Sequence, residues 1–178
     1  IYANTKINAT YIDESMAIKN LLNNSARLIV VNRNLTDEES NVLRQYGIIP
    51  HVTKIAVDAV ALIVHNENPN SMFANETLKK IFTGENKTWK QVSDKSEADS
   101  IIAVFDNSNS SNARLLKEKF LGTSPFPENI FAVKTNKEVI DYVSAHTRAL
   151  GVIGVNWLSD WSDSLTNSFL SKVRVVSL

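Results

Sequence analysis

The sequence has 178 residues, enough for one well-formed core or two smaller lobes. Its 19 basic and 19 acidic side chains cancel, so the composition indicates neither a nucleic-acid partner nor a membrane surface. Cysteine is absent, which excludes disulfides and thiolate metal sites, and no apolar run has the length that crosses a bilayer.

The first thirty residues predict a strand, a helix and a second strand. Residues 6–11 alternate weakly between polar and apolar, which favours a strand. A helix is expected over 15–23, capped by Asp13, Glu14 or Ser15, because its apolar residues recur on one face. Residues 26–31 form an apolar, β-branched run that is typical of a buried strand.

A second helix is predicted from Thr36 to about Tyr46. Thr36 stands three residues before Glu39, the spacing of a capping box, in which each side chain bonds the other residue's backbone N–H. Gly47 follows as the expected C-terminal cap.

The long apolar run at residues 52–64 predicts an extended strand that bends or passes from one lobe to another. It is more than twice the usual strand length of about 5 or 6 residues. Asp58 lies in its middle, and a charge there indicates either a cleft or a solvent-facing strand edge.

The remaining chain alternates short helices and strands, which predicts an α/β fold. We expect helices at 75–82, at a short segment headed by Trp89, at 110–121 and, capped by Asn136, to about His146; strands at 101–104, 131–133, 151–155 and 173–176; and a loop or irregular helix at 156–169.

The polar stretch 105–114 lies between the predicted strand at 101–104 and a helix start. Such a junction directs backbone N–H groups, serine hydroxyls and the positive end of the helix dipole at one point, which suits an anion. Ordinary helix capping by asparagine and serine explains the same composition.

Catalytic motifs are scarce. The three histidines fall singly, and the sequence has no zinc-type spacing, nucleophile elbow, Walker loop or dinucleotide-binding glycine turn. A hydrolase using Ser110 or Ser111 with His146 is one alternative, yet nothing signals an orienting partner. The sequence therefore favours binding over catalysis, with no catalytic residue, no metal ligand and no cofactor predicted.

Four blocks in register resemble the phosphate-binding proteins of ABC phosphate importers. In that family a crossover strand, a Leu–Ile–Phe–Gly–Trp block, a Ser-Gly-Thr loop at a helix start and a return strand occur in this order. The matching residues are 55–64, 78–84 with Trp89, 109–111, and 140–143 continuing to 151–154. The composition is similar to the shorter members found in Bacteroidetes-like bacteria.

The resemblance implies a type II periplasmic-binding-protein fold, in which two α/β lobes are joined by crossover strands. Residues 52–64 and 151–155 would be the crossovers, with Asp58 at the hinge. Lobe one would comprise 1–58 and 154–178, and lobe two 59–153. The family's opening strand and helix would precede Ile1, so we expect lobe one to be incomplete.

The resemblance also implies a ligand-binding set: Asn109, Ser110 and Ser111 of the helix-start loop, with Arg33 and Arg114. Two positions depart from the family pattern. Ser110 replaces the loop glycine, and Phe105 replaces an arginine, for which Arg114 would substitute.

The implied function is capture of inorganic phosphate by an extracytoplasmic solute-binding protein. Its partners would be phosphate and the permease subunits of an ABC importer, and its location periplasmic or lipid-anchored to the envelope. Two alternatives stay open: a binder of another small oxyanion such as sulfate, and an envelope or signalling module that keeps the fold without capturing ligand.

Overall fold

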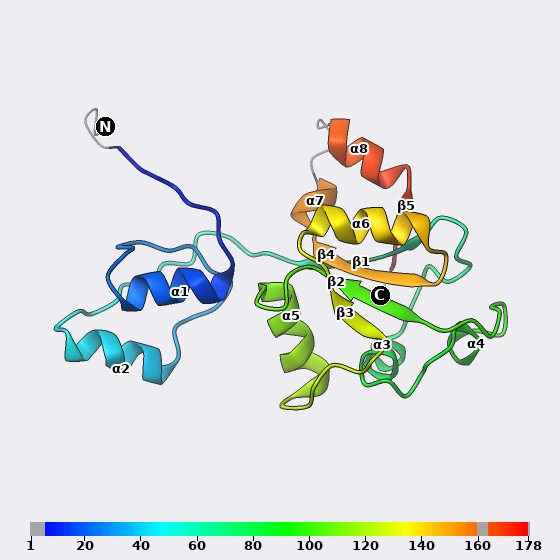
Figure 1. Ribbon diagram of the computed structural model, residues 1–178, viewed down its shortest axis with the longest axis horizontal. Coiled ribbons are helices and arrows are strands. Elements are labelled where there is room, and N and C mark those ends of the chain that lie inside the picture. The colour runs from blue at the N-terminus through cyan, green and yellow to red at the C-terminus, as the bar shows by residue number, and fades with distance from the viewer. Residues whose placement is uncertain (1–5, 160–163, 178) are drawn as a thin grey trace. The chain divides into compact units, whose positions relative to one another are not determined.

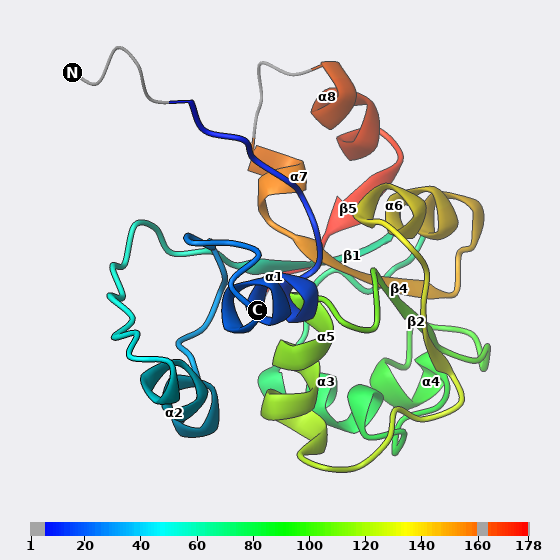
Figure 2. The same ribbon diagram turned by 60° about the vertical axis from the view of Figure 1, so that its left-hand side comes forward.

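The computed structural model describes residues 6–159 and 164–177, and the chain divides into two compact units, Ile1–Thr53 and Lys54–Leu178. Figures 1 and 2 show the helices and strands from two directions.

The first unit contains two helices, α1 (Glu14–Leu22) and α2 (Asp37–Gln45). The Asp13 side chain caps α1 by accepting a hydrogen bond from the backbone N–H of Met16 at 2.9 Å. The predicted capping box of α2 is confirmed, since Thr36 and Glu39 each bond the other's backbone. Gly47 has a φ of 73°, the left-handed conformation that glycine supplies after a helix.

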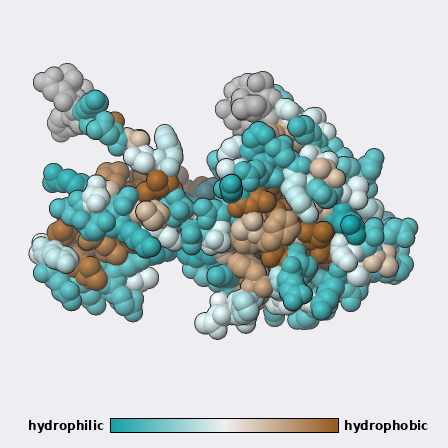
Figure 3. All heavy atoms as spheres, in the orientation of Figure 1, coloured by the Kyte–Doolittle hydropathy of each residue, from teal (hydrophilic) through white to brown (hydrophobic). Residues whose placement is uncertain are grey.

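The first unit has a very small core. Among its described residues only Ala17, Ile18 and Leu43 are buried. The predictions of strands at 6–11 and 26–31 are wrong: both segments are irregular, and Leu28 is 80% exposed. An apolar β-branched run becomes a strand only where another strand pairs with its backbone. Figure 3 shows apolar side chains on the surface of this unit.

The second unit is built on a five-stranded mixed sheet with the strand order β3-β2-β4-β1-β5. β2 runs parallel to β3 and β4, whereas β1 is antiparallel to β4 and β5. The strands are β1 (Val60–His65), β2 (Ile102–Phe105), β3 (Ile130–Ala132), β4 (Ala149–Gly154) and β5 (Val173–Val175).

Helices cover both faces of this sheet (Figure 1). Alternate strand residues enter two cores: Leu62 and Val64 of β1 contribute to one, and Ala61 and Ile63 to the other. The first core also contains side chains of α3 (Asn75–Phe82), α4 (Trp89–Val92) and α5 (Ser111–Leu116), and α5 continues as a π-helical segment, η1 (Lys117–Leu121). The second contains side chains of α6 (Asn136–Ala145), α7 (Asn156–Ser159) and α8 (Ser164–Leu170). The α/β prediction is confirmed.

The predicted continuous strand over 52–64 is wrong in its first half. β1 begins only at Val60, and residues 52–59 are exposed without strand pairing. Asp58 is exposed, and its carboxylate accepts a hydrogen bond from the backbone N–H of Ala59 at 2.8 Å. The hydrophobic pattern alone could not show that the pairing partner, β4, ends opposite Val60.

The division into units differs from the expected lobes at the carboxyl end. Residues 154–178 were expected to return to lobe one, yet β5 pairs with β1, with Ile63 opposite Val175. This segment therefore lies in the same unit as the predicted lobe two. Asn136 was the expected cap of α6, but Thr135 fills that position, accepting from the backbone N–H of Glu138 at 3.2 Å.

Candidate functional site

The carboxyl ends of three parallel strands meet at one edge of the sheet in the second unit. Phe105 ends β2, Ala132 ends β3 and Gly154 ends β4, and helices α5 and α6 begin just after the first two. β1 enters at the same edge, since Val60 lies opposite Gly154. Ligands of α/β proteins bind at this edge of the strands, where helix N-termini converge.

Ser110 is the N-terminal cap of α5. Its Oγ accepts a hydrogen bond from the backbone N–H of Ala113 at 3.2 Å, and its hydroxyl donates to Oδ1 of Asp106 at 2.6 Å. The single hydroxyl proton of Ser110 is therefore already bonded to a carboxylate.

Asp106 is the centre of a hydrogen-bonded network at this edge. Its second oxygen accepts from Nδ2 of Asn136 at 3.2 Å, and Oδ1 of Asn136 accepts from the backbone N–H of Gly154 at 3.1 Å. Nδ2 of Asn112 also donates to Asn136 at 3.4 Å. Asp106 and Asn112 are buried. The network joins the ends of β2 and β4 to the starts of α5 and α6.

The other predicted residues of the helix-start loop lie beside this network. Asn109 is exposed, and its backbone N–H donates to Oδ1 of Asn107 at 2.8 Å. Ser111 is half-buried in the first turn of α5. Arg114 lies one turn later, where its Nη1 pairs with Glu118 at 2.9 Å.

Arg33 lies in the first unit. Its guanidinium forms two hydrogen bonds to Glu39, at 2.7 and 2.8 Å, and its Nε lies 3.5 Å from a carboxylate oxygen of Glu14. The bond from Arg33 lowers the pKa of Glu39, with the N–H of Thr36 acting in the same direction. Arg33 thus links the loop before α2 to the capping box of that helix through hydrogen bonds to Glu39.

Sequence reasoning identified the loop but missed its partners. Asp106, Asn112, Asn136 and Gly154 contribute to the network and were not predicted as site residues. The one available signal was an aspartate directly after a buried strand. Over the described ranges 6–159 and 164–177, no cluster of three metal-ligating side chains occurs.

The family and the fold follow from comparison with known proteins. The second unit, a mixed sheet with helices on both faces, has the type II periplasmic-binding-protein fold, which two solved structures share. The model of the PBP superfamily domain matches residues 1–178. The chain belongs to the PBP superfamily.

The relatives confirm the resemblance to phosphate-binding proteins. The chain is 30% identical over 162 residues to the phosphate-binding protein PstS of Borreliella burgdorferi, covering 86% of this chain and 55% of that one. It spans about half the length of the curated relatives it matches.

Two solved structures share the fold. A Clostridium perfringens protein, solved with bound phosphate and assigned to the substrate-binding proteins of phosphate ABC transporters, superposes with a TM-score of 0.71 at 23% identity, over 93% of this chain and 60% of that chain. An ABC-type phosphate transport receptor from Vibrio cholerae gives 0.65 at 21% identity, over 91% and 60%.

Proposed function

We propose that this protein captures inorganic phosphate outside the cytoplasm and passes it to the permease subunits of an ABC importer. The observation that carries the proposal is the start of α5 at the carboxyl edge of the sheet, in a chain whose relatives are named phosphate-binding proteins. The chemistry is non-covalent capture, which requires neither a cofactor nor a catalytic residue.

The proposed donors to the anion are the side chains of Asn109 and Ser111, together with backbone N–H groups of the first turn of α5. The start of a helix leaves such groups without an intrahelical partner and carries a positive partial charge. Ser110 contributes once its hydroxyl turns from Asp106 toward the ligand. Asp106 would then accept a hydrogen bond from a protonated P–O–H group of phosphate, a donor that fully ionised sulfate lacks.

Arg114 is the proposed cation of this site. In the structure it pairs with Glu118, whose side chain is 58% exposed, so an anion could replace that carboxylate at little cost. Arg33 is the second proposed cation. Its two hydrogen bonds to Glu39 must break before Arg33 can take that role. A substitution at Arg33 tests this second cation separately from Arg114.

The location is proposed on the same grounds, as periplasmic or anchored by lipid to the envelope. No helix in the described part of the chain is long and apolar enough to span a membrane. We likewise propose that the partner is the permease of an ABC importer, to which the protein delivers phosphate.

Isothermal titration calorimetry with phosphate and with sulfate tests the proposal. We expect phosphate to bind and sulfate to bind more weakly, with Arg114→Gln lowering phosphate affinity about tenfold or more through loss of a charge-assisted hydrogen bond. Glu118→Gln should raise the affinity, and Lys79→Gln, an exposed charge on α3, serves as the matched control. A wild-type protein that gives no heat and no thermal shift with phosphate would refute the function.

A further inference from the structure

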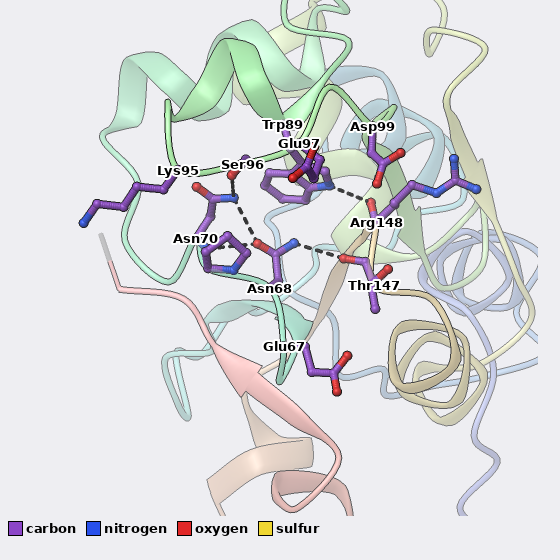
Figure 4. A pocket seen from close by; sticks show the side chains of 11 residues that line it. Glu67, Asn68, Asn70, Trp89, Lys95, Ser96, Glu97, Asp99, Thr147 and Arg148 are labelled. Atoms are coloured by element: carbon purple, nitrogen blue, oxygen red, sulfur yellow. Dashed lines mark hydrogen bonds between the residues drawn. The ribbon is translucent and has the colours of Figure 1, made fainter.

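A cavity lies at the edge of the sheet opposite to Asp106. It has a volume of about 190 Å³ and lies beyond the carboxyl end of β1 and the amino end of β4 (Figure 4). β1 has six residues, and a strand rises about 3.3 Å per residue, so roughly 20 Å separates the two edges. The cavity is therefore not part of the proposed phosphate site.

Three buried polar residues, Asn68, Asn70 and Ser96, form the floor of this cavity. Nδ2 of Asn70 donates to Oδ1 of Asn68 at 3.0 Å and to Oγ of Ser96 at 2.7 Å, and Nδ2 of Asn68 donates to the carbonyl of Thr147 at 3.1 Å. Figure 4 shows these bonds as a continuous chain. The floor is thus held in place by its own hydrogen bonds.

Asn70 keeps one unused acceptor at this floor. Its side-chain oxygen accepts no hydrogen bond from the part of the chain that the structure describes. Among the described residues, every polar side-chain atom that is fully shielded from solvent has a hydrogen-bond partner. Because this oxygen has none, it is accessible to solvent. An amide that is 94% buried and keeps an open acceptor is suited to a ligand that donates hydrogen bonds.

The rim carries charges of both signs. Lys95 and Arg148 are the cations, and Glu67, Glu97 and Asp99 are the carboxylates. All five are exposed, and within residues 6–159 and 164–177 none of them takes part in an ion pair. Such a rim complements a ligand that bears both a positive and a negative group.

The volume of the cavity and its lining residues restrict the class of ligand further. At about 30 Å³ per water molecule, the volume corresponds to roughly six waters, which matches a molecule of few non-hydrogen atoms. Trp89 is only 4% exposed, and its indole N–H donates to the carbonyl of Arg148 at 3.1 Å. The ring therefore offers no open face on which a sugar could stack.

We propose that this cavity binds a small zwitterion with the chemistry of a free α-amino acid. The ammonium group would donate to Oδ1 of Asn70 and pair with Glu97. The carboxylate would pair with Arg148. This site is independent of phosphate capture.

Protein-observed ¹H–¹⁵N NMR tests the proposal by titration with glycine, L-serine and L-aspartate, beside acetate, methylammonium and glucose. We expect an amino acid to shift the amide signals of Asn70, Ser96 and Arg148 saturably, at least tenfold more tightly than the single-charge probes or glucose. Arg148→Gln and Glu97→Gln should each weaken this binding at least tenfold.

The matched controls are Glu76→Gln and Lys172→Gln, two exposed charges outside the cavity, which should leave the binding unchanged. The proposal is overturned if no amino acid gives saturable shifts up to about 10 mM, because a site with a millimolar Kd would be close to saturation at that concentration. Equal binding of glucose, or binding that survives both rim variants, would overturn it as well.

Discussion

Replacing Ser110 by alanine should destabilise the second unit. The change removes the cap of α5 and the 2.6 Å hydrogen bond to the buried Asp106 carboxylate. Loss of a cap costs about 1 kcal/mol, and loss of a hydrogen bond to a charged group costs about 1.5–3 kcal/mol. We therefore expect the free energy of unfolding to fall by about 2.5–4 kcal/mol.

Tryptophan fluorescence isolates the response of this unit. All three tryptophans, at positions 89, 157 and 161, fall within residues 54–178. Urea unfolding followed at this signal should show a lower midpoint with an unchanged slope. The thermal midpoint should fall by roughly 5–16 °C, at about 2–4 °C per kcal/mol for a chain of this size.

Ser108→Ala is the matched control, since Ser108 is exposed in the same loop. Its effect should stay within about 0.5 kcal/mol, as for most surface substitutions. If Ser110→Ala were no more destabilising than Ser108→Ala, the Asp106 network would not stabilise this edge of the sheet.

Two further predictions concern packing and pH. A Cβ on Gly151 would lie 2.7 to 3.0 Å from three core side chains, so Gly151→Ala should cost about 1–3 kcal/mol in chemical denaturation. Gly154→Ala is the comparison, because its Cβ would meet the side-chain end of the exposed Asn156; equal losses would contradict the packing argument. The pKa of Glu39 is lowered in the folded state, so its contribution to stability is present above the ordinary value of 4.5 and lost as pH falls through the folded value. Circular dichroism should show a loss of helix on acidification, and this loss should be smaller in Arg33→Gln. An acid transition that is the same in the variant as in the wild type would contradict the prediction.

The helices were predictable because their signals are local. Asp13 and the Thr36–Glu39 pair act within one turn, so a few neighbouring residues determine where α1 and α2 begin. Strands depend on partners that are distant in the sequence. The runs at 26–31 and 52–59 have strand composition and remain irregular, whereas residues 60–65 of the same apolar stretch pair with β4 and β5.

The same distinction between local and long-range signals applies to the candidate site. The position of the loop could be predicted, because a polar run after an apolar strand is a local pattern. The bond between Asp106 and Asn136 joins residues 30 positions apart, and only the strand order brings them together. The pairing of Arg114 with Glu118 follows from their i, i+4 spacing on one helix face. The pairing of Arg33 with Glu39 depends on the path of the loop before α2, which the sequence pattern does not specify.

The exposed segment before β1 gives Asp58 a role in solubility. Ile55 is 72% exposed and Val57 80%, and in the described part of the chain no backbone–backbone hydrogen bond involves residues 55–57. A short apolar segment with unpaired backbone is a template for pairing between molecules. Lys54 and Asp58 stand on either side of it, the arrangement of gatekeeper charges that limits aggregation. The charge that interrupts the apolar run thus keeps the segment soluble while its backbone is unpaired.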